Sequence, residues 1–157
     1  MSQLPIIEYP DPILLKKTEL IADAKKPAIQ KLISDMLETM VKNNGVGLAA
    51  PQVGKSLRLC VIQVDDETYV LINPKITYKS YVKEICEEGC LSFPGKFLPI
   101  QRHKKVRVKA LNERGEEVTV KAQGLLSRAL QHEIDHLDGK VFIERMTKNK
   151  KDARKQK

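Results

Sequence analysis

The segment GLLSRALQHEIDHLDG, residues 124–139, carries the strongest structural and chemical signal in the chain. Its apolar residues recur at the spacing of one helix face, as shown by Leu125, Leu126, Ala129, Leu130 and Leu137. Residues four apart on a helix lie on the same face, so His132 and His136 can bind one metal ion. Glu133 lies about 100° further round the helix, where it can reach a water molecule on that ion rather than the ion itself. The segment therefore predicts a helix that carries a metal site.

A catalytic site of this kind needs a third protein ligand and an open fourth position. One class of metallopeptidases uses a later histidine, in HExxHxxGxxH, but the last position of that pattern is Phe142 here. Another class uses a glutamate from a later helix, yet the sole glutamate after His136 is Glu144. We therefore expect the third ligand to come from upstream.

The upstream candidates are Cys86, Cys90, His103, Glu84, Glu87 and Glu88. Cys90 follows Gly89, which would let the backbone approach a site closely. A structural zinc site with both Cys86 and Cys90 is disfavoured, because residues four apart in an extended strand lie about 13 Å from each other. One cysteine and two histidines, with water in the fourth position, is the better interpretation. Cys60 lies inside an apolar strand and is expected to be structural.

A second motif, GVGLAAPQVG at residues 45–54, offers a neutral side-chain amide in Gln52. Such an amide can donate a hydrogen bond to a developing oxyanion. The loop lacks the spacing of a nucleotide-binding fingerprint and follows a predicted helix rather than a strand. Taken alone the signal is weak, because these glycines could simply end the helix and turn the chain.

The remaining pattern predicts an α+β fold, with a largely antiparallel sheet packed around a central metal-binding helix. An amphipathic N-terminal helix is expected from about Pro27 to Asn43, and the metal-binding helix from Gln123 or Gly124 to Leu137. Strands are expected at residues 57–64 and 68–73, within residues 76–94, and in a hairpin formed by residues 105–111 and 117–122. We expect a single catalytic domain over residues 1–146 and a basic tail over residues 147–157.

Charge and composition limit the class of protein. The chain has 157 residues and a formal net charge of +8, of which +6 lies between Arg145 and the C-terminus. Aromatic residues make up 4% and tryptophan is absent, which disfavours a nucleic-acid module that reads stacked bases. Three cysteines, no long apolar run and no basic, apolar N-terminal leader predict a cytoplasmic protein without a membrane segment.

Three segments together resemble the peptide deformylase family, whose motifs have the forms GxGxAAxQ, EGCLS and HExDH. The chain has GVGLAAPQ at residues 45–52, EGCLS at residues 88–92 and HEIDH at residues 132–136, in that order. The similarity runs from PDPILLKKTE, residues 10–19, to about Arg145. This resemblance implies a bacterial-type, metal-dependent hydrolase that removes the formyl group from the N-terminal formylmethionine of newly made polypeptides and releases formate.

The resemblance also implies roles for individual residues. Cys90, His132 and His136 would hold one Fe2+ per chain, with Zn2+, Ni2+ or Co2+ as possible replacements. Glu133 would act as acid and base, and the Gln52 side chain and the Leu91 backbone N–H would stabilise the oxyanion. The residues implied near the substrate are Gly45, Val46, Gly47, Cys86, Gly89, Arg102 and Leu125. Arg128 stands where some members have an apolar residue, which leaves one pocket wall open to question.

Two other interpretations compete with this one, namely a general metallopeptidase and a structural-zinc module that binds nucleic acid. The first lacks the downstream ligand, and the second lacks aromatic residues. The basic tail has its own alternatives: it docks to ribosomal RNA, or it is an ordinary solvated terminus.

Overall fold

The computed structural model describes residues 2–145. Its longer α-helices are α1 (Pro27–Lys42) and α2 (Gly124–Leu137), and its short 3-10 helices are η1 (Pro12–Leu15) and η2 (Ala50–Val53). The strands are β1 (Gly47–Ala49), β2 (Leu59–Val64), β3 (Glu67–Lys79), β4 (Lys83–Cys90), β5 (Phe93–His103), β6 (Lys105–Leu111) and β7 (Glu117–Gln123).

The strands form two antiparallel sheets. The larger sheet has the order β1-β2-β3-β6-β7, and β4 and β5 form a separate two-stranded sheet. Every strand pair in both sheets is antiparallel. The predicted α+β class with a largely antiparallel arrangement is therefore confirmed.

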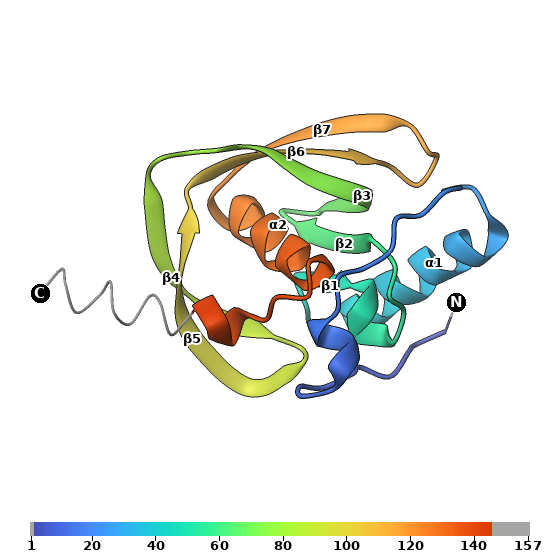
Figure 1. The fold of residues 1–157 in the computed structure, drawn as a ribbon, viewed down its shortest axis with the longest axis horizontal. Helices are drawn as coiled ribbons and strands as arrows, with labels where there is room; N and C mark the ends of the chain where they lie inside the picture. The colour runs from blue at the N-terminus through green and yellow to red at the C-terminus, as the bar shows by residue number, and fades with distance from the viewer. Residues whose placement is uncertain (1, 146–157) are drawn as a thin grey trace, which may run out of the picture.

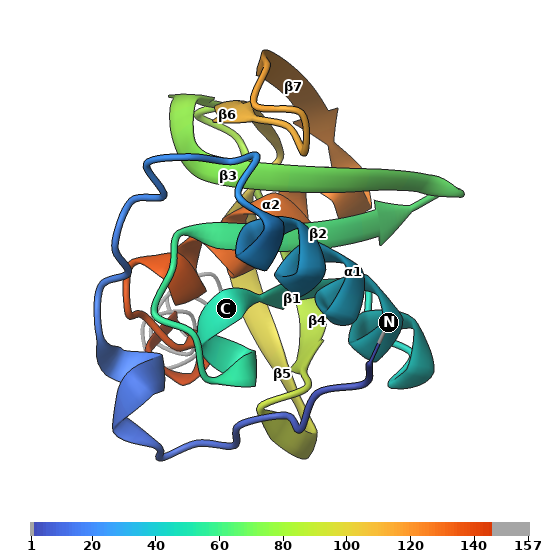
Figure 2. The same ribbon diagram turned by 90° about the vertical axis from the view of Figure 1, so that its right-hand side faces the viewer.

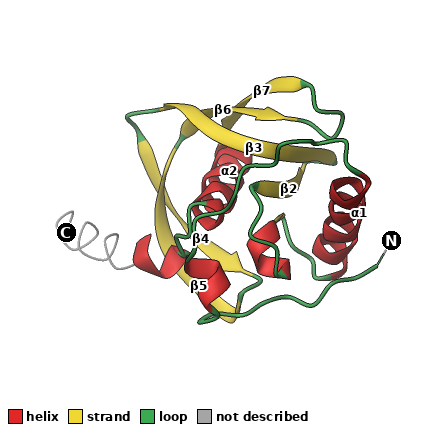
Figure 3. Ribbon diagram, turned by 45° about the vertical axis from the view of Figure 1, so that its right-hand side comes forward, coloured by secondary structure: helices red, strands yellow, loops and turns green. Residues whose placement is uncertain are grey.

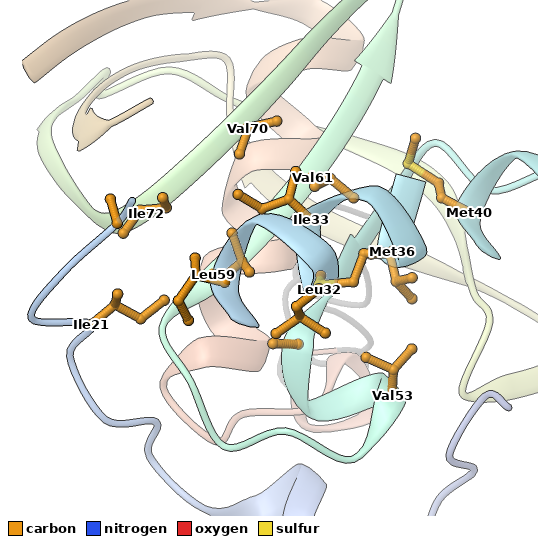
Figure 4. Close-up of a cluster of buried hydrophobic side chains, with 14 residues drawn as sticks. Ile21, Leu32, Ile33, Met36, Met40, Val53, Leu59, Val61, Val70 and Ile72 are labelled. Atoms are coloured by element: carbon orange, nitrogen blue, oxygen red, sulfur yellow. The ribbon is translucent and has the colours of Figure 1, made fainter. Parts of the chain in front are cut away.

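The two faces of β2 explain how the larger sheet is covered. Leu59 and Val61 belong to one buried cluster, whereas Cys60 and Ile62 belong to another. Alternate side chains of a strand point to opposite faces, so β2 is buried on both sides. The first cluster lies against α1, which is nearest the viewer in Figure 2 and whose buried side chains appear in Figure 4.

Helix α2 lies at the centre of the molecule, with the larger sheet on one side and β4–β5 on the other (Figures 1 and 3). Leu130, Ile134 and Leu137 face the larger sheet in the second cluster. The opposite face of α2 carries polar side chains that are also buried, among them His132 and Glu133. A helix buried on all sides can hold polar groups only if partners or a ligand satisfy them.

The sequence predicted the positions of both helices and of the β6–β7 hairpin. Gly139 follows the end of α2 with φ 74°, and a side chain there would lie 2.8 Å from the backbone oxygen of Leu15. The strand predicted at residues 68–73 was too short, because β3 continues to Lys79. Its pairing with β6 shifts register between Ile72 and Lys75, where Pro74 has no N–H to donate.

Among the residues that the structure describes, no helix is long and apolar enough to cross a membrane. The basic tail expected at residues 147–157 lies outside the described residues, as does Met146.

Candidate metal centre

Three side chains from two elements bring potential metal ligands together. His132 and His136 project from successive turns of α2, and Cys90 ends β4. The strand register shifts between Gly89 and Cys90, so Cys90 leaves the regular ladder. Such an irregularity re-aims a side chain. Among the described residues, these three form the one group of histidine, cysteine or acidic side chains with metal-ligand spacing.

The geometry of the three donors suits a metal ion. The two Nε2 atoms lie 3.2 Å apart, and Cys90 Sγ lies 3.3 Å from His136 Nε2. Nitrogen and sulfur ligands of a tetrahedral ion lie about 3.3–3.6 Å from one another, given their usual bond lengths. The donor set of one thiolate and two imidazoles favours a transition metal over Mg2+ or Ca2+. These residues therefore fit the ion that the family resemblance implies.

Glu88 orients His132 for this role. The Nδ1 atom of His132 lies 2.9 Å from Glu88 Oε1, while its Nε2 faces the other two donors. Burial raises the pKa of the Glu88 carboxyl, but hydrogen bonds from His132 and Arg102 outweigh it and hold the pKa well below its usual range. An ionised Glu88 accepts a hydrogen bond from Nδ1–H of His132 and leaves Nε2 free to bind a metal.

The two histidines have opposite electrostatic environments in the metal-free protein. Burial opposes protonation of His132, but hydrogen bonds to Cys90 and Glu88 and the charge of Glu133 raise its pKa to about 10. Burial and the neighbouring His132 lower the pKa of His136 to about 3. The pair therefore holds one proton in excess, and metal binding must displace it.

Glu133 is buried beside the donors without a hydrogen-bond partner for its Oε1 atom. Burial raises its pKa from 4.5 to about 7, and the nearby Glu88 also contributes. Gly47 makes room for this carboxylate, because a Cβ there would lie 2.6 Å from Glu133 Oε2. A carboxyl that gains and loses a proton near neutral pH suits acid–base chemistry.

The amide of Gln52 is held in one orientation. Its Oε1 accepts a hydrogen bond of 2.9 Å from the backbone N–H of Ala49, so its amino group points the other way. That Nε2 lies 3.1 Å from Ser92 Oγ and 3.6 Å from Cys90 Sγ. A buried amide donor therefore faces the sulfur side of the donor group.

A cavity of about 620 Å³ opens onto these groups. It brings together the segments around all three sequence motifs, and its walls include Gly45, Val46, Gly47, Gln52, Gly89, Cys90, Leu91, Leu125, Arg128, His132 and Glu133. Val46 and Leu125 are 40% and 55% exposed, so they offer apolar surface to a ligand. Gly89 lies under the ring of Phe97, since a Cβ on Gly89 would approach that ring to 2.8 Å. Of the residues expected near the substrate, the structure thus brings five to one cavity.

Two of the expected residues lie elsewhere. Arg102 does not line the cavity and is 4% exposed, so it is not an ordinary surface charge. Its guanidinium donates two hydrogen bonds to Glu88 and one of 2.6 Å to Asp135. Cys86 is exposed and also lies outside the cavity walls. Arg102 bonds to Asp135 of α2, whereas Cys86 lies two residues before Glu88 on β4.

The sequence interpretation missed the buried charges beneath the site. Glu88 was considered only as a possible ligand, whereas it is the partner of His132, Arg102 and Arg128. Asp135 bridges Arg102 and Arg145. One signal for these charges was present in the sequence. Charged residues lie inside the helix that was predicted to be central, and buried charged residues require partners. His103, another possible ligand, bonds to the backbone oxygen of Ser80 instead.

The helix-borne histidine pair, the added cysteine and the buried glutamate define a mononuclear metal-hydrolase type of site. Residues 3–152 match the family model described as polypeptide deformylase. The chain belongs to the peptide deformylase family.

Individual relatives agree over most of their length. The peptide deformylase of Thermodesulfovibrio yellowstonii is 46% identical over 157 residues, covering 97% of this chain and 94% of the relative. That of Clostridium botulinum is 48% identical over 148 residues, covering 94% and 99%. The crystal structure of peptide deformylase from Thermotoga maritima superposes with a TM-score of 0.90 at 41% identity, covering 93% and 99%. The Ehrlichia chaffeensis enzyme in complex with actinonin gives 0.92 at 43% identity, covering 97% and 93%.

Proposed function

We propose that the chain hydrolyses the formyl amide of N-formylmethionyl peptides and releases formate, with Cys90, His132 and His136 holding one metal ion. The observation that carries this proposal is the juxtaposition of these donors at one cavity with the buried Glu133, whose Oε1 has no hydrogen-bond partner. Family membership supplies the reaction class, and the geometry supplies residues suited to each role.

When bound, the ion would provide a hydroxide nucleophile from water at neutral pH. Glu133 accepts the proton that water loses and passes it to the leaving amine, which suits its pKa of about 7. The Gln52 amino group and the Leu91 backbone N–H donate to the oxygen of the formyl group as negative charge develops there. Loss of one such donor typically reduces the rate about 10²- to 10³-fold.

The cavity walls support the substrate part of the proposal. β1 is an edge strand of the larger sheet and β4 belongs to the two-stranded sheet, and Gly47 and Gly89 on these strands both line the cavity. A peptide could add to these edges through backbone hydrogen bonds, with Gly45 and Val46 alongside. The methionine side chain would then contact the apolar surface of Val46 and Leu125.

We further propose Fe2+ as the native ion, with Zn2+, Ni2+ or Co2+ as replacements, and the cytoplasm as the location. The mixed thiolate and imidazole donors accept all four ions. Residues 147–157 are proposed as a basic tail that follows one catalytic domain and docks the enzyme near the ribosome. Its support is the excess of lysine and arginine after residue 145, which suits a phosphate-rich surface.

The direct test is formate release from a formyl-Met-Ala-Ser peptide by Fe2+-loaded protein prepared without oxygen. We expect rapid release from this peptide and little hydrolysis of the acetyl-Met-Ala-Ser analogue, because the formyl hydrogen is small. Glu133→Gln should retain the metal and lose turnover, since the ligands remain while the proton acceptor is gone. Absence of formate release by the metal-loaded wild type would refute the proposed reaction, and near-native turnover by the variant would remove Glu133 from its role.

A further inference from the structure

Arg128 joins the two parts of the protein that supply the metal ligands. It lies on α2 one turn before His132 and is 9% exposed. Its Nη1 donates to Glu88 Oε2 at 2.6 Å and to the backbone oxygen of Ile100 at 2.9 Å. Its Nη2 donates to the backbone oxygen of Glu84 at 2.8 Å. One side chain of α2 thus holds β4 at two residues and β5 at a third.

This connection matters because the ligands are divided between α2 and β4. Cys90 ends β4, and β4–β5 is not part of the larger sheet against which α2 packs. Sheet hydrogen bonds therefore do not fix the distance from Cys90 to the histidines, and side-chain contacts between α2 and β4–β5 contribute to it. Ser127, Gln131 and Asp135 of α2 bond to His103 and Arg102 of β5. The strand that carries Cys90 is reached by two bonds from Arg128 and by the bond between His132 and Glu88, and Arg128 adds a third bond, to β5.

Arg128 is not needed to neutralise Glu88. Arg102 already bonds to both carboxylate oxygens, at 2.9 and 3.0 Å. The additional bond from Arg128 fixes the direction of the carboxylate, and hence of the His132 ring that bonds to it. Removal of Arg128 would leave Glu88 paired, so the folded state should survive, whereas removal of Arg102 would leave two buried carboxylates short of a partner.

Arg128 also forms part of the cavity wall, next to Leu125 and Ala129. Its guanidinium donates three hydrogen bonds inside the protein, one to Glu88 and two to backbone oxygens. A methionine in place of Arg128 would keep an unbranched, apolar wall and remove the donors.

We propose that Arg128 is a positioning residue for the metal centre: by bonding to Glu84, Glu88 and Ile100, it holds the Cys90 strand and the His132 ring at metal-binding distance. The inference rests on the proposed Cys90–His132–His136 centre. It differs from that proposal in placing part of the metal affinity in a side chain that is not itself a metal ligand.

The test measures Co2+ affinity by chelator competition, together with the thiolate-to-cobalt absorption band that reports a Cys90–metal bond. Arg128→Met should lose about 10- to 100-fold in affinity, as is typical when a group that orients a ligand is removed. Arg128→Lys keeps the positive charge, but one ammonium group cannot bond to three acceptors as the forked guanidinium does. Its loss of Co2+ affinity should therefore be smaller than that of Arg128→Met but not absent.

The matched control is Arg58→Met. Arg58 also bonds to α2, through Asp138 at 2.8 Å and the backbone oxygen of Leu137, and it bonds to the backbone oxygen of Pro74 at 2.9 Å. It reaches neither β4 nor β5 through these bonds. Arg58→Met should lower the urea midpoint of the metal-free protein without changing Co2+ affinity.

The outcomes separate the two proposals. If wild-type protein binds Co2+ without a thiolate band, the proposed metal centre itself fails. If wild type shows the band and Arg128→Met binds Co2+ as tightly, the centre stands and the positioning role is refuted. Equal losses of Co2+ affinity in Arg128→Met and Arg58→Met would be a general effect of destabilisation. That result would also refute the positioning role of Arg128.

Discussion

Replacing Glu133 with glutamine should change how the stability of the metal-free protein depends on pH. Burial raises the pKa of Glu133 from 4.5 to about 7 in the folded state. A raised folded pKa means that the folded protein binds this proton more tightly than the unfolded chain does. The resulting contribution to stability is complete below pH 4.5 and is lost as the pH rises through about 7.

The size of this effect follows from the two pKa values. A tenfold difference in proton affinity corresponds to about 1.4 kcal/mol, so the interval from 4.5 to about 7 amounts to about 3 kcal/mol. Glu133→Gln cannot ionise and should not show this loss. Relative to the variant, the wild type should therefore lose about 3 kcal/mol of unfolding free energy between pH 4.5 and pH 8.

Urea unfolding of both metal-free proteins across this pH range measures the difference directly. Any constant cost of fitting an amide in place of the carboxyl cancels, because only the change of the difference with pH is used. The ion must be absent, since a nearby cation would stabilise the carboxylate and hide the effect. A difference that stays flat from pH 5 to pH 8 would refute the claim that burial penalises the Glu133 carboxylate.

Further predictions concern the metal, the oxyanion and the tail. Cys90→Ser should reduce metal content measured by atomic absorption far more than Cys86→Ser, because a hydroxyl poorly replaces a thiolate; equal contents would remove Cys90 from the ligand set. Gln52→Ala should lower kcat about 10²- to 10³-fold with little change in metal content, measured by formate release. Peroxide should inactivate the Fe2+ form faster than the Ni2+ form, and matched rates would argue against an iron enzyme. Truncation after Met146 should preserve activity on short peptides but weaken ribosome co-sedimentation at low salt.

Local patterns in the sequence were sufficient to predict the two helices and the β6–β7 hairpin. The 3.6-residue spacing in residues 124–137 reflects packing against the larger sheet, and that packing is regular. The histidine pair was equally predictable, since a separation of four residues on a helix fixes their common face. These features follow from the spacing of residues that are close along the chain, which a single sequence records directly.

Features that depend on pairing between distant segments were not predictable in the same way. Arg102 was expected near the substrate, but its partners Glu88 and Asp135 lie 14 and 33 residues away along the chain. Nothing in the local pattern around Arg102 shows whether the strand turns it toward the cavity or toward α2. The continuation of β3 past Pro74 was missed for the same reason. The proline is accommodated by a shift in register with β6, a strand that lies far away along the chain.

Glu88 and Glu133 show how the fold assigns different chemistry to two similar groups. Both are buried, at 7% and 4% exposure, and burial alone would raise the pKa of each. Glu88 receives hydrogen bonds from two arginines and His132, so it stays ionised and holds the imidazole in place. Glu133 has one carboxylate oxygen without any partner, so its proton affinity remains high. A fully paired carboxylate cannot exchange protons near neutral pH, and an unpaired one cannot fix a ligand. The site therefore requires both environments next to His132, Glu88 from β4 and Glu133 from α2. The energetic cost of leaving one oxygen of Glu133 without a partner accompanies its capacity to move a proton.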